Sequence, residues 1–262
     1  MNYVRREFIQ GAPVSKNYTQ HSPSALNLFA AEPSMFVLER ILGIKQTVGA
    51  VAHRGSAIED GVAHGLLNLD NQEIEPLEKA AIKVAQARYD VLTAMSGDAR
   101  RDKFRSDIPE MVSLALEELR HYGKPTDTQG FITWKPEDLH YPIVGYFDFK
   151  WENDGIIVDL KTTDRMPSDI KIAHARQVSL YAASDNQEGR LTYCTPKKVQ
   201  TLKLENIREH RQALHNIARK VEAFLALSED PAFFTSITVP DLDSFYWSSP
   251  VARQLAFEHW GV

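Results

Sequence analysis

The feature that most constrains this chain is a pair of β-forming segments joined by a very short turn. Residues 143–151 and 156–161 are rich in β-branched and aromatic side chains, which favour strands. The Asp154-Gly155 pair between them is a strong signal for a hairpin. Strands that meet through this turn place Trp151 opposite Ile156, and this pairing fixes the register of the whole hairpin.

In this register Asp148 lies opposite Asp159, and alternation along the strand places Lys161 on the same face. The other face carries a core, made of Phe147, Phe149, Trp151, Ile156, Val158 and Leu160. Facing carboxylates, with Cβ atoms roughly 5 Å apart, repel each other unless a cation lies between them. Carboxylates, water and phosphate oxygens are a usual environment for Mg²⁺, and a lysine beside them can stabilise charge on phosphate or orient water. These groups suffice for phosphodiester hydrolysis.

The D-x-K pattern alone is weak, because about two copies are expected by chance in a chain of ordinary charge content. It occurs at Asp148–Lys150, Asp159–Lys161 and Asp169–Lys171. The last copy lies at an expected helix start, where a solvated charge pair is the simpler interpretation. For Asp159–Lys161 the alternative is a surface salt bridge, and Asp148–Lys150 is a rival for the functional motif.

The remaining patterns predict an α/β (α+β) fold with a mixed central sheet flanked by helices. Helical periodicity dominates residues 22–122, with a start at Ser22 and a break near Pro33. Further strands are expected at 131–134 and 191–195, and further helices at 108–121, 169–184 (capped by Ser168) and 204–228. We predict a flexible arm over 1–21 and one domain over 22–262, divided into a helical part 22–122, a catalytic core 123–228 and a tail 229–262.

Composition limits the class of protein. The single cysteine, Cys194, allows no internal disulfide and favours an intracellular, cytoplasmic location. The first residues lack a signal peptide's apolar stretch, and no segment is long enough to span a membrane. The net charge of −5 counts mildly against nucleic-acid binding, although a nuclease needs positive charge only along its substrate groove.

Three motifs resemble the RecB-like branch of the PD-(D/E)xK nuclease superfamily. They are Gly145-Tyr146-Phe147-Asp148, then Ile157 to Thr163 containing Asp159-Leu160-Lys161-Thr162, then Gln177 with Tyr181. The resemblance implies a restriction-endonuclease-like core, with Asp148, Asp159 and the carbonyl of Leu160 as ligands of one or two Mg²⁺ or Mn²⁺ ions. It also implies that Lys161 assists attack of water, and that Gln177 and Tyr181 contact substrate or position the lysine. For that last pair the alternative is a buried tyrosine with an amide partner.

The resemblance extends more weakly upstream, through Ser22 to Phe36 and Arg54 to Glu59. Many members have a metal-binding histidine four residues after the glycine at position 55. This chain has Glu59 there, as related phage-type exonucleases do, and a carboxylate is an acceptable ligand. Glu59 as an ordinary exposed residue is the alternative, and Asp60 and His64 are weaker candidates. The cysteines that hold an iron–sulfur cluster in Cas4-like relatives are missing, so no cluster is expected.

The resulting hypothesis is a standalone DNA exonuclease of phage type that acts in recombination, repair or degradation. A single-strand-binding or recombination protein is its expected partner. Its rivals are an endonuclease of the same fold, a non-catalytic DNA-binding or assembly protein, and an accidental motif in an unrelated α/β protein. The residues at 100–105 are interpreted as a solvated loop, and Lys197 and Lys198 as candidates for the groove. The tail aromatics could stack on bases, but core packing is the simpler expectation; they are Phe233, Phe234, Phe245, Tyr246 and Trp247.

Overall fold

The computed structural model describes residues 18–46, 48–71, 73–182 and 187–262. Their contacts group the chain into two compact units. Unit 1 comprises residues 1–46, 133–144 and 213–262, and unit 2 comprises residues 47–132 and 145–212. The arm expected over 1–21 falls mostly outside the described residues, while Tyr18 and His21 are described and buried.

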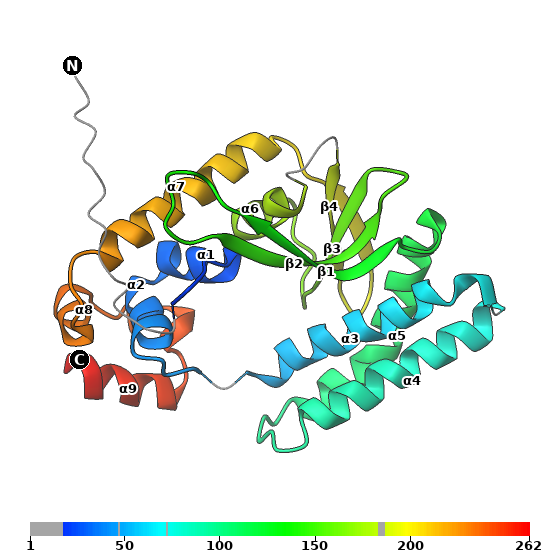
Figure 1. Ribbon diagram of the computed structural model, residues 1–262. Coiled ribbons are helices and arrows are strands. Elements are labelled where there is room, and N and C mark those ends of the chain that lie inside the picture. The colour runs from blue at the N-terminus through cyan, green and yellow to red at the C-terminus, as the bar shows by residue number, and fades with distance from the viewer. Residues whose placement is uncertain (1–17, 47, 72, 183–186) are drawn as a thin grey trace. The chain divides into compact units, whose positions relative to one another are not determined.

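Unit 2 is built around a mixed sheet, as the sequence predicts, and the sheet has five strands (Figure 1). The strands, in their order across the sheet, are β1 (Asp127–Trp134), β2 (Ile143–Trp151), β3 (Ile156–Thr162), β4 (Glu188–Cys194) and β5 (Val199–Lys203). β3 and β4 run parallel, so the chain needs a crossover between them, and α6 (Ile172–Tyr181) lies within it. β2–β3 and β4–β5 are antiparallel.

The hairpin has the predicted register. Trp151 pairs with Ile156, and the ladder continues to Phe149 opposite Val158. The turn closes with a hydrogen bond of 3.2 Å from the Gly155 N–H to the Glu152 carbonyl. Gly155 has φ +64°, a left-handed conformation that costs glycine little. The Asp-Gly signal therefore identified the turn for a physical reason.

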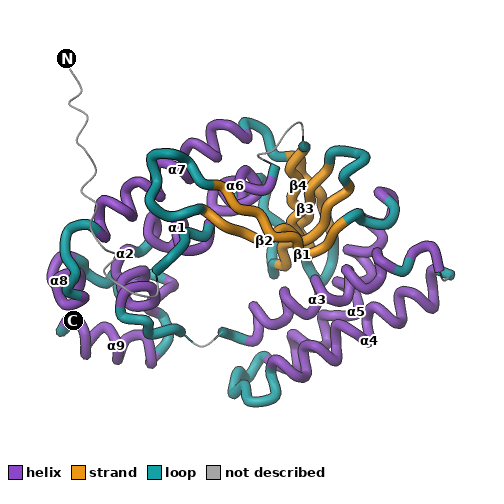
Figure 2. Tube along the Cα trace, viewed as in Figure 1, coloured by secondary structure: helices purple, strands orange, loops and turns teal. Residues whose placement is uncertain are grey.

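Three long helices pack together in unit 2, namely α3 (Ala50–Leu67), α4 (Ile74–Leu92) and α5 (Arg101–Leu119) (Figure 2). Two short 3₁₀ turns follow α3 and α5, η2 (Leu69–Asn71) and η3 (Arg120–Tyr122). The apolar side chains of α3, α4 and α5 form one core with the sheet residues Phe149, Trp151, Ile156, Val158 and Leu160. The predicted apolar face of the hairpin, with the exception of Phe147, belongs to this core, and Phe147 is buried elsewhere.

Two local predictions were wrong, and one strand was missed. α5 begins at Arg101, so the charged residues expected in a loop are helical, because Phe104 and Ile108 anchor this turn in the core. α6 begins at Ile172 rather than 169, and Ser168 does not cap it. β5 was not predicted, because its short alternation is only half-buried and resembles a loop.

Unit 1 is mainly helical in the part the structure describes. Its elements are α1 (Pro23–Ala31), α2 (Pro33–Phe36), the π-helix η1 (Val37–Ile41), most of α7 (Ile207–Leu225), α8 (Pro231–Ile237), η4 (Phe245–Trp247) and α9 (Pro250–Trp260). Ser22 caps α1 as predicted, by accepting a hydrogen bond from the Ala25 N–H. The tail aromatics divide: Phe234 and Trp247 are fully buried, whereas Phe245 is 85% exposed.

A buried acidic residue organises unit 1. Glu222 on α7 accepts hydrogen bonds from the backbone N–H groups of His140 and Tyr141 and contacts the His21 imidazole at 3.1 Å. The other ring nitrogen of His21 shares a hydrogen bond with the Tyr18 hydroxyl. These bonds satisfy polar groups that would be costly to bury alone. None of the helices in the described residues is both long and apolar enough for a membrane crossing.

Candidate active site

The predicted catalytic residues of the hairpin lie together in unit 2. The Lys161 ammonium contacts Oδ2 of Asp159 at 2.5 Å, and the Asp159 side chain is fully buried. The carboxylate of Asp148, itself 8% exposed, accepts a hydrogen bond of 2.6 Å from the backbone N–H of Leu160. That bond holds the Asp148 side chain beside Leu160, which lies between Asp159 and Lys161.

Asp148 reaches this position by a route that simple alternation does not predict. Gly189 on β4 faces α6. Gly189 pairs with Ile157 on β3, and Ile157 pairs with Lys150 on β2, so Lys150 is on the face of the sheet that α6 covers. Gly145 precedes Lys150 by five residues, so strict alternation along β2 would place it on the opposite face, away from α6. A methyl group on Gly145 would, however, lie 2.7 Å from the ring of Tyr181 on α6, so Gly145 faces α6 as well. Alternation along β2 is therefore broken between Gly145 and Lys150. Asp148 lies within this interval, and its carboxylate bonds to the neighbouring strand.

Glu59 joins the aspartates from α3. Its carboxyl shares a hydrogen bond with that of Asp148 and also accepts one from the Gln129 side chain at 3.1 Å. Gln129 has φ +53°, a left-handed backbone conformation that is unusual for residues other than glycine, asparagine or aspartate. α3 passes close to β3 nearby, since a methyl group on Gly55 would lie 3.0 Å from Oγ1 of Thr162. Glu59 thus places a third carboxyl group at the site.

The three acids concentrate negative charge in a place with little water. Burial, together with the charges of Asp159 and Glu59, raises the pKa of Asp148 well above its usual range. Burial likewise raises the pKa of Glu59. Burial lowers the pKa of Lys161, but Asp159 and Asp148 outweigh it and leave that pKa raised, so the lysine stays charged. One ammonium group faces three carboxyl groups.

This donor set fits a divalent cation. Carboxylate oxygens are the hard ligands that Mg²⁺ and Mn²⁺ prefer. Oδ1 of Asp159 is buried and lacks a hydrogen-bond partner, an arrangement that is costly unless something else binds it. Within the described ranges, no three His, Cys, Asp or Glu side chains are already placed as a complete metal site. The chemistry of the donors, rather than a preformed cage, is what fits the ion.

Gln177 and Tyr181 lie one turn apart on α6, as predicted, and the Gln177 amide donates a hydrogen bond of 2.8 Å to the Tyr181 hydroxyl. Burial and then the charge of Asp159 raise the pKa of Tyr181, so the hydroxyl stays neutral near the acids. His174, which sequence reasoning missed, shares a hydrogen bond of 2.8 Å with the Tyr193 hydroxyl. Burial, followed by the Lys161 charge, lowers the His174 pKa to about 4. Only its place one turn before Gln177 could have indicated it.

Arg54 is a second residue that the sequence did not single out. Its side chain is fully buried and binds Asp107 on α5 at 3.0 Å and Asp164, just after β3, at 2.8 Å. Its guanidinium also lies 4.9 Å from the centre of the Phe104 ring. Arg54 therefore connects α3 and α5 to the segment that follows Lys161.

Most of the cations considered for DNA contact are engaged within unit 2. Arg100, Lys103 and Arg105 form ion pairs with Asp98, Asp107 and Asp90. Lys197 and Lys198 lie in the turn between β4 and β5. Arg88, paired with Asp60 at 3.0 Å, lines a cavity of about 540 Å³ together with His64 and Gln129.

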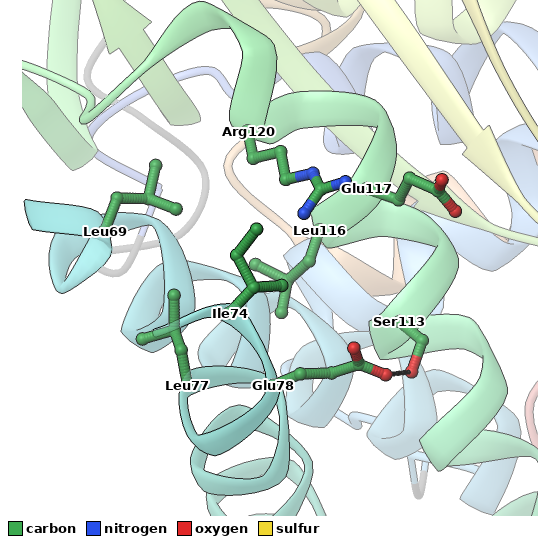
Figure 3. A pocket seen from close by; sticks show the side chains of 8 residues that line it. All are labelled: Leu69, Ile74, Leu77, Glu78, Ser113, Leu116, Glu117 and Arg120. Carbon is green, nitrogen blue, oxygen red and sulfur yellow. Dashed lines mark hydrogen bonds between the residues drawn. The ribbon is translucent and has the colours of Figure 1, made fainter. Parts of the chain in front are cut away.

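A separate cavity lies in the helical layer. It has a volume of about 260 Å³ and is lined mainly from α4 and α5 (Figure 3). Figure 3 shows apolar side chains such as Leu77 and Leu116 together with a hydrogen bond between Ser113 and Glu78. The candidate catalytic residues do not line it, so it is a feature of helix packing.

Comparisons with known proteins identify the family of the chain. No curated protein matches the chain. Among solved structures, one described as the crystal structure of SSO0001 is 16% identical, with 86% of this chain and 98% of that chain covered; its TM-score of 0.35 is too low to support an argument. The family model described as "PD-(D/E)XK nuclease superfamily" matches residues 20–236, which include every candidate catalytic residue above. The chain therefore belongs to the PD-(D/E)XK nuclease superfamily.

Proposed function

We propose that this chain is a divalent-metal-dependent DNA exonuclease of the RecB-like branch. Membership of the superfamily implies a nuclease that acts on DNA, and such enzymes generally use Mg²⁺ or Mn²⁺. The observation that carries the proposal is the meeting of Asp148, Asp159 and Lys161 at one point of the sheet, with Glu59 hydrogen-bonded to Asp148. The exonuclease assignment rests on the resemblance of the motifs to that branch.

The roles follow from the contacts. Asp148, Asp159 and Glu59, with the Leu160 carbonyl, would hold the cation, which when bound supplies Lewis-acid activation of the phosphate and of water. The hydrogen bond from the Leu160 N–H orients the Asp148 carboxylate. Lys161, charged and held by Asp159, stabilises negative charge that develops on the scissile phosphate or orients the attacking water.

Gln177 and Tyr181 complete the site from α6. The Tyr181 hydroxyl is neutral and buried, so it can donate a hydrogen bond to a phosphate oxygen without adding negative charge. The Gln177 amide donates to that hydroxyl and fixes its direction. We place the activity in recombination, repair or degradation of DNA in the cytoplasm.

The test is digestion of end-labelled linear DNA, single- and double-stranded, with Mg²⁺, Mn²⁺ or EDTA. Lys161→Ala is expected to lower the rate on the order of 10²–10³-fold, the usual effect of losing one charge-stabilising group. The matched control is Lys150→Ala, in the rival D-x-K tripeptide of the same hairpin. The Lys150 ammonium contacts the exposed Glu152 carboxylate at 3.2 Å, so its loss should leave the rate nearly unchanged.

The products distinguish the alternatives. Progressive release of short products from an end, with closed circular DNA left intact, supports the exonuclease; cutting of the circle supports an endonuclease instead. DNA binding by folded wild type without cleavage in any metal would refute the catalytic assignment and favour a binding or assembly protein. An equal loss in both lysine variants would mean that Lys161 has no special role.

A further inference from the structure

Gln129 on β1 bridges two adjacent acidic residues of α3. Its amide nitrogen lies 3.1 Å from Oε1 of Glu59 and 3.2 Å from Oδ1 of Asp60, and it donates a hydrogen bond to each. Because an ionised carboxylate only accepts hydrogen bonds, both contacts require the same orientation of the amide, with its nitrogen toward α3. The two hydrogens of that nitrogen are therefore both used, one on each acidic side chain.

Asp60 is held from a second direction. Its other oxygen, Oδ2, lies 3.0 Å from Nε of Arg88 on α4, so Gln129 and Arg88 occupy different oxygens of the same carboxylate. On the opposite side of the bridge, Glu59 shares a hydrogen bond with the proposed metal ligand Asp148. A continuous series of contacts therefore connects α4 and β1 to the acids of the candidate active site.

Gln129 makes these bonds from a strained backbone. Its φ of +53° lies in the left-handed region, where a Cβ atom is crowded and glycine is favoured. Such conformations persist only where surrounding contacts hold them, and they are concentrated at functional sites. Glycine would suit this backbone better, so the Gln129 side chain needs a use that outweighs the strain.

Core packing is not that use. Gln129 is exposed, and with Asp60 and Arg88 it lines the cavity of about 540 Å³. Its side chain therefore fills no part of the core. A substitution at this position removes hydrogen bonds rather than apolar contacts.

An amide suits the task of orienting a metal ligand. It fixes the direction of a carboxylate without adding a positive charge, so the carboxylate keeps its charge for a cation. A lysine or arginine on Glu59 would instead compete with that cation. The cationic member of this series, Arg88, binds Asp60 and not Glu59. Groups that orient metal ligands in this way commonly decide how tightly the metal binds.

Building on the proposed function, we propose that Gln129 is a positioning residue for the metal ligand Glu59. Its amide holds Oε1 of Glu59, and Asp60, anchored by Arg88, holds the amide in turn. Asp60, which the sequence offered as a weaker candidate ligand, is on this account a partner of Gln129.

The test measures metal binding without DNA. Mn²⁺ is titrated into the full chain, and electron paramagnetic resonance measures the free ion. Gln129→Met keeps the length of the side chain but has no donor, and it should weaken Mn²⁺ binding about tenfold, a usual effect of losing a group that orients a ligand. Gln254→Met is the matched control. Gln254 likewise donates to a carboxylate, that of Glu258 at 2.9 Å, but it lies on α9 outside unit 2, so the affinity should not change.

Two further variants make the test specific. Gln129→Gly relieves the backbone and removes the amide, so it should keep the melting temperature of wild type and still lose the affinity that Gln129→Met loses. If Gln129 served only the shape of β1, glycine would retain the wild-type affinity. In a Glu59→Ala background, adding Gln129→Met should weaken Mn²⁺ binding no further, because Gln129 acts through Glu59.

The outcomes separate this proposal from the proposed function. Wild-type affinity in either Gln129 variant, an additive loss in the Glu59→Ala background, or no Mn²⁺ binding by folded wild type each overturns the positioning role, even if wild type cleaves DNA. A loss in both Gln129 variants that is absent from the control and from the Glu59→Ala background upholds the role. If the same wild type cleaves no DNA in any metal, the exonuclease assignment alone fails.

Discussion

Replacing Arg54 by methionine removes a buried charge but keeps most of the side chain's volume. In the folded protein the guanidinium is fully buried and bonds to Asp107 and Asp164. Removing one member of a buried ion pair usually costs about 3–5 kcal/mol, because the partner is left charged and dry. Here, however, neither aspartate would be left both dry and without a cation. Asp164 is 59% exposed at its side chain, and Asp107 keeps a contact of 3.1 Å with Lys103.

The expected loss is therefore smaller than for a stranded charge. Two hydrogen bonds to charged groups contribute about 1.5–3 kcal/mol each, but methionine no longer requires burial of a cation, which offsets several kcal/mol. We expect Arg54→Met to lower the free energy of unfolding by about 2–3 kcal/mol. Asp164→Asn should cost only about 0.5–1 kcal/mol, because that carboxylate is largely solvated.

Urea titration followed by far-UV circular dichroism and by tryptophan fluorescence measures both effects. Of the four tryptophans, only Trp151 belongs to unit 2, so a variant that retains it alone reports on the unit that contains Arg54. Arg54→Lys is a useful comparison, since lysine cannot bond to both carboxylates in the fork geometry of a guanidinium. A loss below about 0.5 kcal/mol for Arg54→Met, or an equal loss for Asp164→Asn, would refute this account.

Three further predictions concern packing, pH and thiol reactivity. Gly145→Ala places a methyl group 2.7 Å from the buried Tyr181 ring, so calorimetry should show a loss of about 1–3 kcal/mol, whereas Gly97→Ala, with open space around it, should be neutral. Burial raises the pKa of Glu222, but the hydrogen bonds that its carboxylate accepts outweigh burial and leave the pKa below the usual 4.5. The stabilisation that Glu222 provides is therefore complete above pH 4.5 and is lost as the pH falls further. Glu222→Gln should flatten this pH dependence of stability in acid titrations. Burial raises the Cys194 pKa to about 12, so Ellman's reagent at pH 8 should react only after unfolding; rapid reaction of the native protein would contradict its burial.

The hairpin could be predicted from the sequence because several local signals agree there. Alternation, the Asp-Gly turn and the run from Ile156 to Leu160 all specify one register, and the structure has it. The break at Asp148 could not be predicted, because it depends on a hydrogen bond to the neighbouring strand and on Gly145 packing against α6. The same holds for β5, whose strand conformation depends on pairing with β4 more than on its own sequence.

Residues that act through distant partners were also missed. Gln129 reaches Glu59 from 70 positions away, and its backbone conformation has no sequence signal in a residue of this type. Arg54 appears in the sequence as one more charge on an amphipathic helix, and only the fold shows that it is buried. The candidate catalytic motif was recognisable because its residues are local to one hairpin and one following helix. Its supporting contacts come from the rest of unit 2.

The acidic cluster leads to a last prediction, in which one substitution has opposite effects with and without metal. Without a cation, the charges of Asp159 and Glu59 disfavour the charged form of Asp148. Asp148→Asn removes that repulsion, and its amide oxygen can still accept the Leu160 N–H bond, so the variant should be at least as stable as wild type in EDTA. With Mg²⁺ at about 100 times its Kd, wild type should gain about 2.7 kcal/mol, and the variant, with one ligand lost, should gain much less. Thermal unfolding of both proteins in the two buffers measures this crossing. A variant destabilised by more than about 1 kcal/mol in EDTA, or one that gains as much as wild type from Mg²⁺, would mean that the aspartate serves the fold rather than the metal.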